Sequence, residues 1–139
     1  MTCFLKGENK CPHSKTIQPI AEKIEKADCV IITSPSYSLN VTAVCKNFID
    51  HMSYKFHRPS YFDKKMLAIS MQAGGGSKQV TKYLSKVFTY WGFNRCYQLT
   101  SSSGSWIDNK PSEKDILKAE KIAENSVKML KVGNFTPLL

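Results

Sequence analysis

The chain has 139 residues, of which 42% are hydrophobic and 22% are charged, and these values are typical of a soluble globular protein. We therefore expect residues 1–139 to form a single domain. The formal charge of +9 comes almost entirely from lysine, and a positive field favours phosphate-bearing or acidic partners. Because the lysines of the last segment alternate with glutamates, they indicate a solvated helix face, and we do not expect nucleic-acid binding.

The sequence shows no targeting or membrane signal. No apolar run is long enough for a membrane span, and the first residues do not resemble a signal peptide. The five cysteines are an odd number at uneven spacing, which favours free thiols in a reducing compartment. We therefore expect a cytoplasmic protein without contact with a membrane.

The first half of the chain alternates between helical and extended patterns. Apolar residues at helical spacing predict a first helix that ends before Asp28. The β-branched run at 29–33 predicts a strand that is buried on both faces. A second helix is expected at 43–52, with Asn40 or Thr42 as its N-cap.

The same alternation continues in the second half. A polar aromatic connector at 54–63 leads to a predicted strand at 65–71. Ser77 is the expected cap of a third helix, which ends at Gly92, and residues 95–99 predict the next strand.

A serine-rich loop around Trp106 precedes the last predicted helix, which opens with a capping-box pattern at 111–115. Its expected core positions are Ile116, Ala119, Ala123 and Leu130. Strands that alternate with helices imply right-handed crossovers and a parallel sheet covered on both faces. The sequence therefore predicts an α/β three-layer sandwich with three core strands.

The segment after the first strand is the first candidate for a ligand site. Ser34-Pro35 stops the strand, and a set of small hydroxyl side chains and one aromatic ring, Tyr37, follows as far as Asn40. In an open parallel sheet, ligands bind beyond the carboxyl ends of the strands. Such a loop suits a flat heteroaromatic ligand, although serine and proline also dominate ordinary turns.

The segment at 71–77 is the second candidate. Its three consecutive glycines, 74–76, let the backbone approach a ligand closely and aim amide N–H groups outward beside a helix N-terminus. The spacing matches neither the P-loop nor the dinucleotide fingerprint, and a flexible turn is the alternative interpretation. By position, this loop is expected beside the loop at 34–40 on the same edge of the sheet.

Several blocks together resemble the flavodoxin-like NAD(P)H-dependent FMN reductase family, which includes iron–sulfur flavoproteins and multimeric flavodoxin-type quinone reductases. The blocks are 34–50, Lys64-Lys65, 73–76 and 90–93. The resemblance implies FMN as cofactor, NAD(P)H as substrate and no protein acid or base, since the flavin carries the redox chemistry. The residues that it implies as contacts of the flavin ring are Ser34, Pro35, Ser36, Tyr37, Ser38, Asn40, Ala73, Gly74, Gly75 and Gly76.

The sequence departs from this family at its beginning. It shows no counterpart of the family's first strand, phosphate-binding loop and second strand, so we expect an N-terminally truncated flavodoxin-like domain that binds FMN weakly at best. Cys3 and Cys11 are too few for a four-iron cluster, which needs four ligands, and adding His13 makes no convincing zinc site. No metal is expected.

Two functions therefore stay open. The first is an FMN-dependent NAD(P)H oxidoreductase that uses the two loops as flavin contacts. The second is a non-catalytic fragment that dimerises or binds a partner through the sheet edge at Val30–Thr33, since unpaired strand edges invite pairing with another chain. We also expect the chain to self-associate as a homo-oligomer such as a homodimer.

Overall fold

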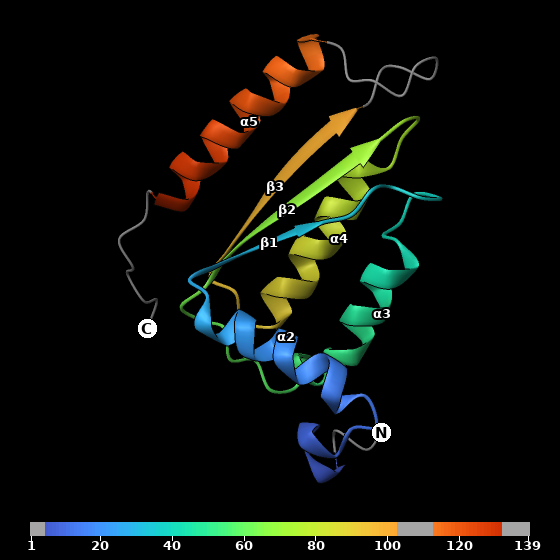
Figure 1. Ribbon diagram of the computed structural model, residues 1–139, viewed down its shortest axis with the longest axis vertical. Helices are drawn as coiled ribbons and strands as arrows, with labels where there is room; N and C mark the ends of the chain where they lie inside the picture. The colour runs from blue at the N-terminus through green and yellow to red at the C-terminus, as the bar shows by residue number, and fades with distance from the viewer. Residues whose placement is uncertain (1–4, 103–112, 132–139) are drawn as a thin grey trace.

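The computed structural model describes residues 5–102 and 113–131 (Figure 1). Their core is one parallel sheet in the order β1–β2–β3. This arrangement confirms the predicted α/β class, and β3 continues past its predicted end at residue 99. The strands are β1 (Cys29–Thr33), β2 (Lys65–Gln72) and β3 (Arg95–Ser102).

The helices alternate with the strands as the sequence predicts. Figure 1 shows the strands between α5 on one side and α3 and α4 on the other, which gives the layers of a sandwich. In the described part of the chain, no helix has the length and apolar character needed to cross a membrane. The elements are η1 (Glu8–Lys10), α2 (Ser14–Lys26), α3 (Ala43–His51), η2 (Ser53–Phe56), α4 (Ser77–Tyr90) and α5 (Glu113–Lys131).

The core lies between β2 and α4. The middle strand is buried on both faces in its first half, because Leu67 is 2% exposed and its neighbours on the α4 side are fully buried, whereas Met71 near its end is exposed. From α4, Phe88 packs against Trp91 and Phe93, with ring centroids 4.7 and 4.9 Å apart. This aromatic cluster fixes α4 on β2, and α4 in turn follows one of the two candidate loops.

The first strand does not have the expected burial. Ile31 is 57% exposed and Thr33 is also exposed, so β1 is not buried on both faces. The physical reason is its place in the sheet, because within residues 5–102 and 113–131 β1 pairs only with β2 and forms an edge. An apolar hollow of about 390 Å³ lies beside it, and its lining is uncharged: Ile20, Ile24, Val30, Ile31, Ile32, Thr33, Thr42, Val44, Cys45, Phe48 and Phe88.

The predicted core stripe of the last helix is also wrong where it can be tested. Ile116 is 45% exposed, and Ala119 and Ala123 are exposed. Figure 1 shows α5 beside β3, which is the outer strand of the sheet and offers less cover than buried β2 would. The Leu130 side chain, the Trp106 loop, the first residues of the capping-box pattern and Cys3 lie outside the described residues.

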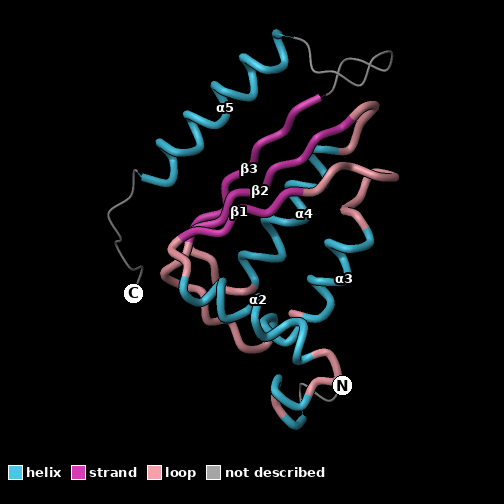
Figure 2. Tube along the Cα trace, viewed as in Figure 1, coloured by secondary structure: helices cyan, strands magenta, loops and turns pink. Residues whose placement is uncertain are grey.

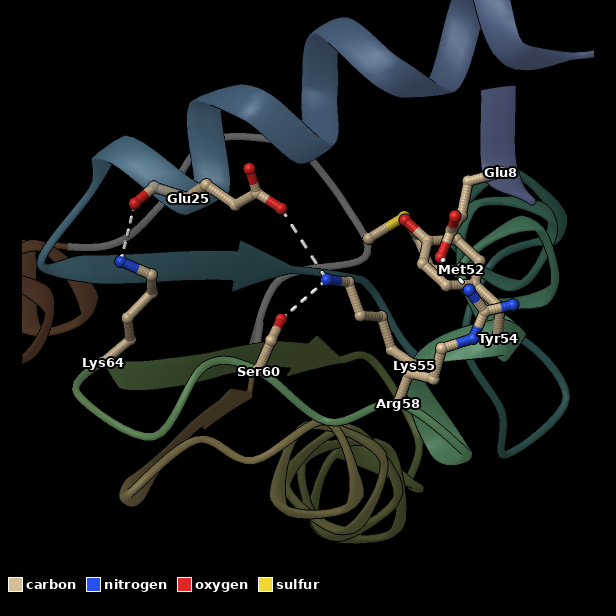
Figure 3. A network of polar contacts seen from close by, with 8 residues as sticks. All are labelled: Glu8, Glu25, Met52, Tyr54, Lys55, Arg58, Ser60 and Lys64. Atoms are coloured by element: carbon tan, nitrogen blue, oxygen red, sulfur yellow. Dashed lines mark hydrogen bonds and ion pairs between the residues drawn. The ribbon is translucent and has the colours of Figure 1, made fainter. Parts of the chain in front are cut away.

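Two buried lysines hold the opposite end of the sheet from the candidate loops (Figure 3). Lys64 Nζ donates to the carbonyl oxygens of Glu25 at 2.7 Å and Ala27 at 3.0 Å, at the C-terminus of α2. Lys55 Nζ donates to Ser60 Oγ at 2.7 Å and lies 3.7 Å from Glu25 Oε1. A cation at a helix C-terminus pairs with carbonyls that lack helical partners. The network therefore ties α2 to the segment that leads into β2.

Candidate functional site

The two candidate loops meet at the carboxyl end of the sheet (Figure 2). The backbone N–H of Ser34 donates to the Ile69 carbonyl oxygen at 3.1 Å, and that of Ser36 donates to the Met71 carbonyl oxygen at 2.9 Å. In addition, Ser36 Oγ donates to the carbonyl oxygen of Gly75 at 2.9 Å. The structure therefore brings together the two segments that the sequence predicts as neighbours.

A tight turn presents the aromatic ring of the first loop. The backbones of Tyr37 and Asn40 exchange two hydrogen bonds of 3.0 Å. Between them, Ser38 and Leu39 have φ values of 50° and 64°, which is the pattern of a type I′ turn. The turn leaves Tyr37 66% exposed, and Pro35, Ser38 and Asn40 are exposed as well. The loop thus offers a ring and polar groups to a ligand.

Ser34 occupies a different environment from the rest of the loop. It is only 2% exposed, and its Oγ accepts the N–H of Thr42 at 3.1 Å and donates to the Pro35 carbonyl oxygen at 3.0 Å. Thr42 is the N-cap of α3, since its side chain accepts the N–H of Cys45 at 3.3 Å. Ser34 therefore connects the end of β1 to the start of α3.

The glycine loop combines one position that needs glycine with two open ones. Gly76 has φ +98°, and a Cβ there would lie 2.2 Å from Ser36 Oγ and 2.9 Å from the Cα of Leu39. At Gly74 and Gly75, by contrast, a Cβ would meet nothing within 4 Å. The surface above these two residues is therefore open to a flat group.

The start of α4 differs from the prediction. Gly76, rather than Ser77, is the N-cap residue, and Ser77 is the first residue of the helix. The N–H of Ser77 donates instead to Gln72 Oε1 at 2.8 Å. Sequence reasoning missed Gln72, although its alternation with buried Met66 and Ala68 along β2 places it on the α4 side of the sheet.

The glycine loop keeps its own backbone donors available. Within residues 5–102 and 113–131, the amide N–H groups of Gly74, Gly75 and Gly76 have no protein acceptor. They precede the N-terminus of α4, where the helix dipole favours electron-rich groups. The loop therefore offers hydrogen-bond donors to an electronegative edge of a ligand.

A hollow of about 550 Å³ opens next to the glycine loop, between α4 and the end of β3. The sequence did not indicate its β3 wall, because the strand was expected to end before these hydroxyl-bearing residues. Leu39 of the first loop also reaches it, which joins the hollow to both candidate loops. Its lining residues are Leu39, Gln72, Gly75, Gly76, Ser77, Lys78, Gln79, Thr100, Ser101 and Ser102.

The thiols and acidic groups of the described residues do not suggest another kind of chemistry. Burial raises the pKa of the Cys29, Cys45 and Cys96 thiols, which lowers their thiolate fraction and their reactivity. Among the described residues, no three His, Cys, Asp or Glu side chains lie close enough to hold a metal ion. The site is instead built from backbone amides, hydroxyls and one aromatic ring.

Comparisons with known proteins show the family of the chain. The model of the NADPH-dependent FMN reductase family matches residues 2–105. An iron–sulfur flavoprotein of Archaeoglobus fulgidus is 39% identical over 92 residues, which are 66% of this chain and 41% of that protein. The chain thus spans about two fifths of the length of this relative.

Solved structures show the fold that goes with this family. The flavodoxin, WrbA-like protein from Agrobacterium tumefaciens superposes with a TM-score of 0.60 at 18% identity, covering 80% of this chain and 71% of that one. General stress protein 14 of Treponema denticola, solved in complex with FMN, gives 0.56 at 13% identity, covering 92% and 76%. The fold is flavodoxin-like, and the chain belongs to the NADPH-dependent FMN reductase family.

Proposed function

We propose that the two loops bind the isoalloxazine ring of FMN and that the protein takes part in flavin-dependent oxidoreduction with NAD(P)H as the electron donor. The ring contacts in this proposal are the residues expected from the sequence other than Ser34, which is 2% exposed and joins the end of β1 to the start of α3: Pro35, Ser36, Tyr37, Ser38, Asn40, Ala73, Gly74, Gly75 and Gly76. When bound, FMN supplies the hydride and electron chemistry, while the protein orients the ring.

One observation carries this proposal, namely the direct contact between an aromatic loop and an open glycine loop at the carboxyl end of a parallel sheet. The Ser36–Gly75 hydrogen bond joins the loops, and Tyr37 is exposed beside them. Ligands of open α/β sheets bind at this end. An aromatic side chain can stack on a flat ring, and glycine lets that ring approach the backbone.

The available donors fit the chemistry of a flavin. The isoalloxazine ring carries carbonyl oxygens and ring nitrogens along one edge, and the amide N–H groups of Gly74, Gly75 and Gly76 have no protein acceptor in the described residues. The formal charge of +9 favours the approach of anionic nucleotides, which include both FMN and NAD(P)H. The proposal assigns residues to the flavin ring and none to the FMN phosphate.

The test compares two flavins that share the ring and differ in the phosphate. FMN and riboflavin are titrated separately into the protein, and binding is followed by quenching of flavin fluorescence. Because the assigned contacts are with the ring, we expect both flavins to bind, with dissociation constants within a few-fold of each other. NAD(P)H added anaerobically should then bleach the visible absorption of the bound flavin.

A variant connects this binding to the first loop. Tyr37→Leu removes the exposed ring, and loss of an aromatic pair worth about 0.5–1.5 kcal/mol weakens binding roughly two- to twelvefold. Tyr90→Leu is the matched control, because Tyr90 is also exposed but lies at the far end of α4 and contacts Phe56. No flavin binding by the unmodified protein, or equal loss in both variants, would contradict the proposal.

The β1 edge supports a second candidate function, which is the binding of another polypeptide through this edge. Ile31 is 57% exposed, and in the part of the chain that the structure describes β1 has a hydrogen-bonded neighbour on one side only. Beside it lies the uncharged hollow between α2, β1 and α3. An exposed apolar edge of this kind favours pairing with a second copy or a partner strand.

A further inference from the structure

Two side chains hold the glycine loop from its two sides. From the first loop, Ser36 Oγ donates to the Gly75 carbonyl oxygen at 2.9 Å. From the end of β2, Gln72 Oε1 accepts the N–H of Ser77 at 2.8 Å. The first bond holds the middle of the loop, and the second joins the residue before the loop to the residue after it. The conformation of the loop therefore depends on side chains outside the three glycines.

The first of these bonds also fixes the direction of a backbone donor. In a trans peptide, the carbonyl and the following N–H point in opposite directions. Because Ser36 holds the Gly75 carbonyl toward the first loop, the N–H of Gly76 is directed away from that loop. The hydroxyl proton of Ser36 is used within the protein by the same bond.

The second bond gives one N–H group at the start of α4 an acceptor. The first N–H groups of a helix have no partner inside it, and loop carbonyls or side chains commonly supply one. Gln72 supplies that acceptor for Ser77, which is buried. The carbonyl oxygen of Gly76 accepts a later N–H group of the helix, that of Val80, at 3.0 Å, so the start of α4 uses acceptors from both Gln72 and the glycine loop.

We propose that Ser36 and Gln72 are positioning residues, which order residues 73–76 before a ligand binds and thereby set the affinity for the flavin ring. This role rests on the proposed function as far as the ligand is concerned. The ordering itself is a property of the free protein and can be measured without flavin. The loop needs such ordering because three glycines have more conformational freedom to lose than other residues. A loop that is ordered in advance binds more tightly, since less freedom is lost on binding.

Amide hydrogen exchange in the flavin-free protein tests the ordering. Gln72→Met removes the acceptor while keeping the length of the side chain, and we expect exchange at the Ser77 amide to rise on the order of tenfold. Gln72→Glu keeps an acceptor and should restore slow exchange. Gln98→Met is the control, since Gln98 is an exposed residue of β3.

Ser36→Ala tests the other bond in the same way. It should shift the NMR signals of the Gly75 and Gly76 amides, while Ser36→Thr, which keeps a hydroxyl, should leave them near their original positions. Ser53→Ala is the control, because Ser53 is exposed in η2. If neither Ser36→Ala nor Gln72→Met changes the loop amides, the positioning role is wrong.

Flavin titrations then separate this proposal from the proposed function. Ser36→Ala and Gln72→Met should weaken FMN and riboflavin binding equally, by about three- to tenfold each. Unchanged affinity despite altered exchange would refute the positioning role. Failure of the unmodified protein to bind flavin would refute the proposed function instead, and hydrogen exchange would still decide whether the two bonds order the loop.

Discussion

The substitution Gly76→Ala gives the sharpest test of the loop geometry. Gly76 has φ +98°, a left-handed conformation that costs a residue with a Cβ roughly 1–2 kcal/mol. The added Cβ would also lie 2.2 Å from Ser36 Oγ and 2.9 Å from the Cα of Leu39. The serine side chain can rotate away, but the backbone of Leu39 belongs to a hydrogen-bonded turn and cannot yield as easily.

Overpacking of this kind typically costs about 1–3 kcal/mol, so the two effects together predict a loss of about 2–5 kcal/mol in the free energy of unfolding. That is a large part of the roughly 5–15 kcal/mol that stabilises a typical domain. Urea denaturation followed by circular dichroism measures the change, with the midpoint falling and the slope unchanged.

Two companion variants make the assay specific. Gly74→Ala should be neutral or stabilising by up to about 1 kcal/mol, because a Cβ there meets nothing within 4 Å and φ is not positive. The double variant Gly76→Ala with Ser36→Ala removes one of the two overlaps and should recover part of the loss. Equal midpoints for Gly76→Ala and Gly74→Ala would refute the close packing of the two loops.

Two further substitutions test the opposite end of the sheet and its edge. Lys64→Met removes a buried ammonium that donates to the carbonyls of Glu25 and Ala27, and should cost about 1.5–3 kcal/mol in urea denaturation; an unchanged midpoint would show that the bonds add nothing. If the β1 edge pairs with a second copy, light scattering should show a dimer at micromolar concentration and a monomer for Ile31→Lys, because a charge is not tolerated in an apolar strand pair. A monomeric unmodified protein would contradict edge pairing.

The sequence is sufficient for the order of the elements, because hydrophobic periodicity is a local property. The burial of a residue, by contrast, depends on elements that are distant in the sequence, and the wrong predictions of burial follow from this. The residues of β1 have the composition of a strand that is covered on both faces, yet Ile31 is 57% exposed because its strand has one neighbour. Ile116 fails for a related reason, since a helical stripe shows which residues share a face and not how much sheet lies beneath them.

The sequence was sufficient to predict where the candidate site lies, but it predicted only part of the contacts within the site. The end of each strand locates its loop, so the sequence places Tyr37 and the glycines at one edge of the sheet. Hydrogen-bond partners depend on distances across the fold, and sequence patterns did not indicate that Ser36 would bond to Gly75 or that Gln72 would bond to Ser77. The preference for Ser77 as the helix cap failed because α4 already includes Ser77, and Gly76, with φ +98°, takes the N-cap position.

The position of the first loop depends on β2 more than on the strand that precedes it. Although β1 is a partly exposed edge, the N–H groups of Ser34 and Ser36 donate to the carbonyls of Ile69 and Met71, which continues the pairing with the buried middle strand beyond the end of β1. The glycine loop extends directly from that same strand. Both loops are therefore held in place by the most buried strand of the sheet. Substitutions along the outer edge of β1 can for this reason alter pairing with another chain while the spacing between Tyr37 and the glycines is kept.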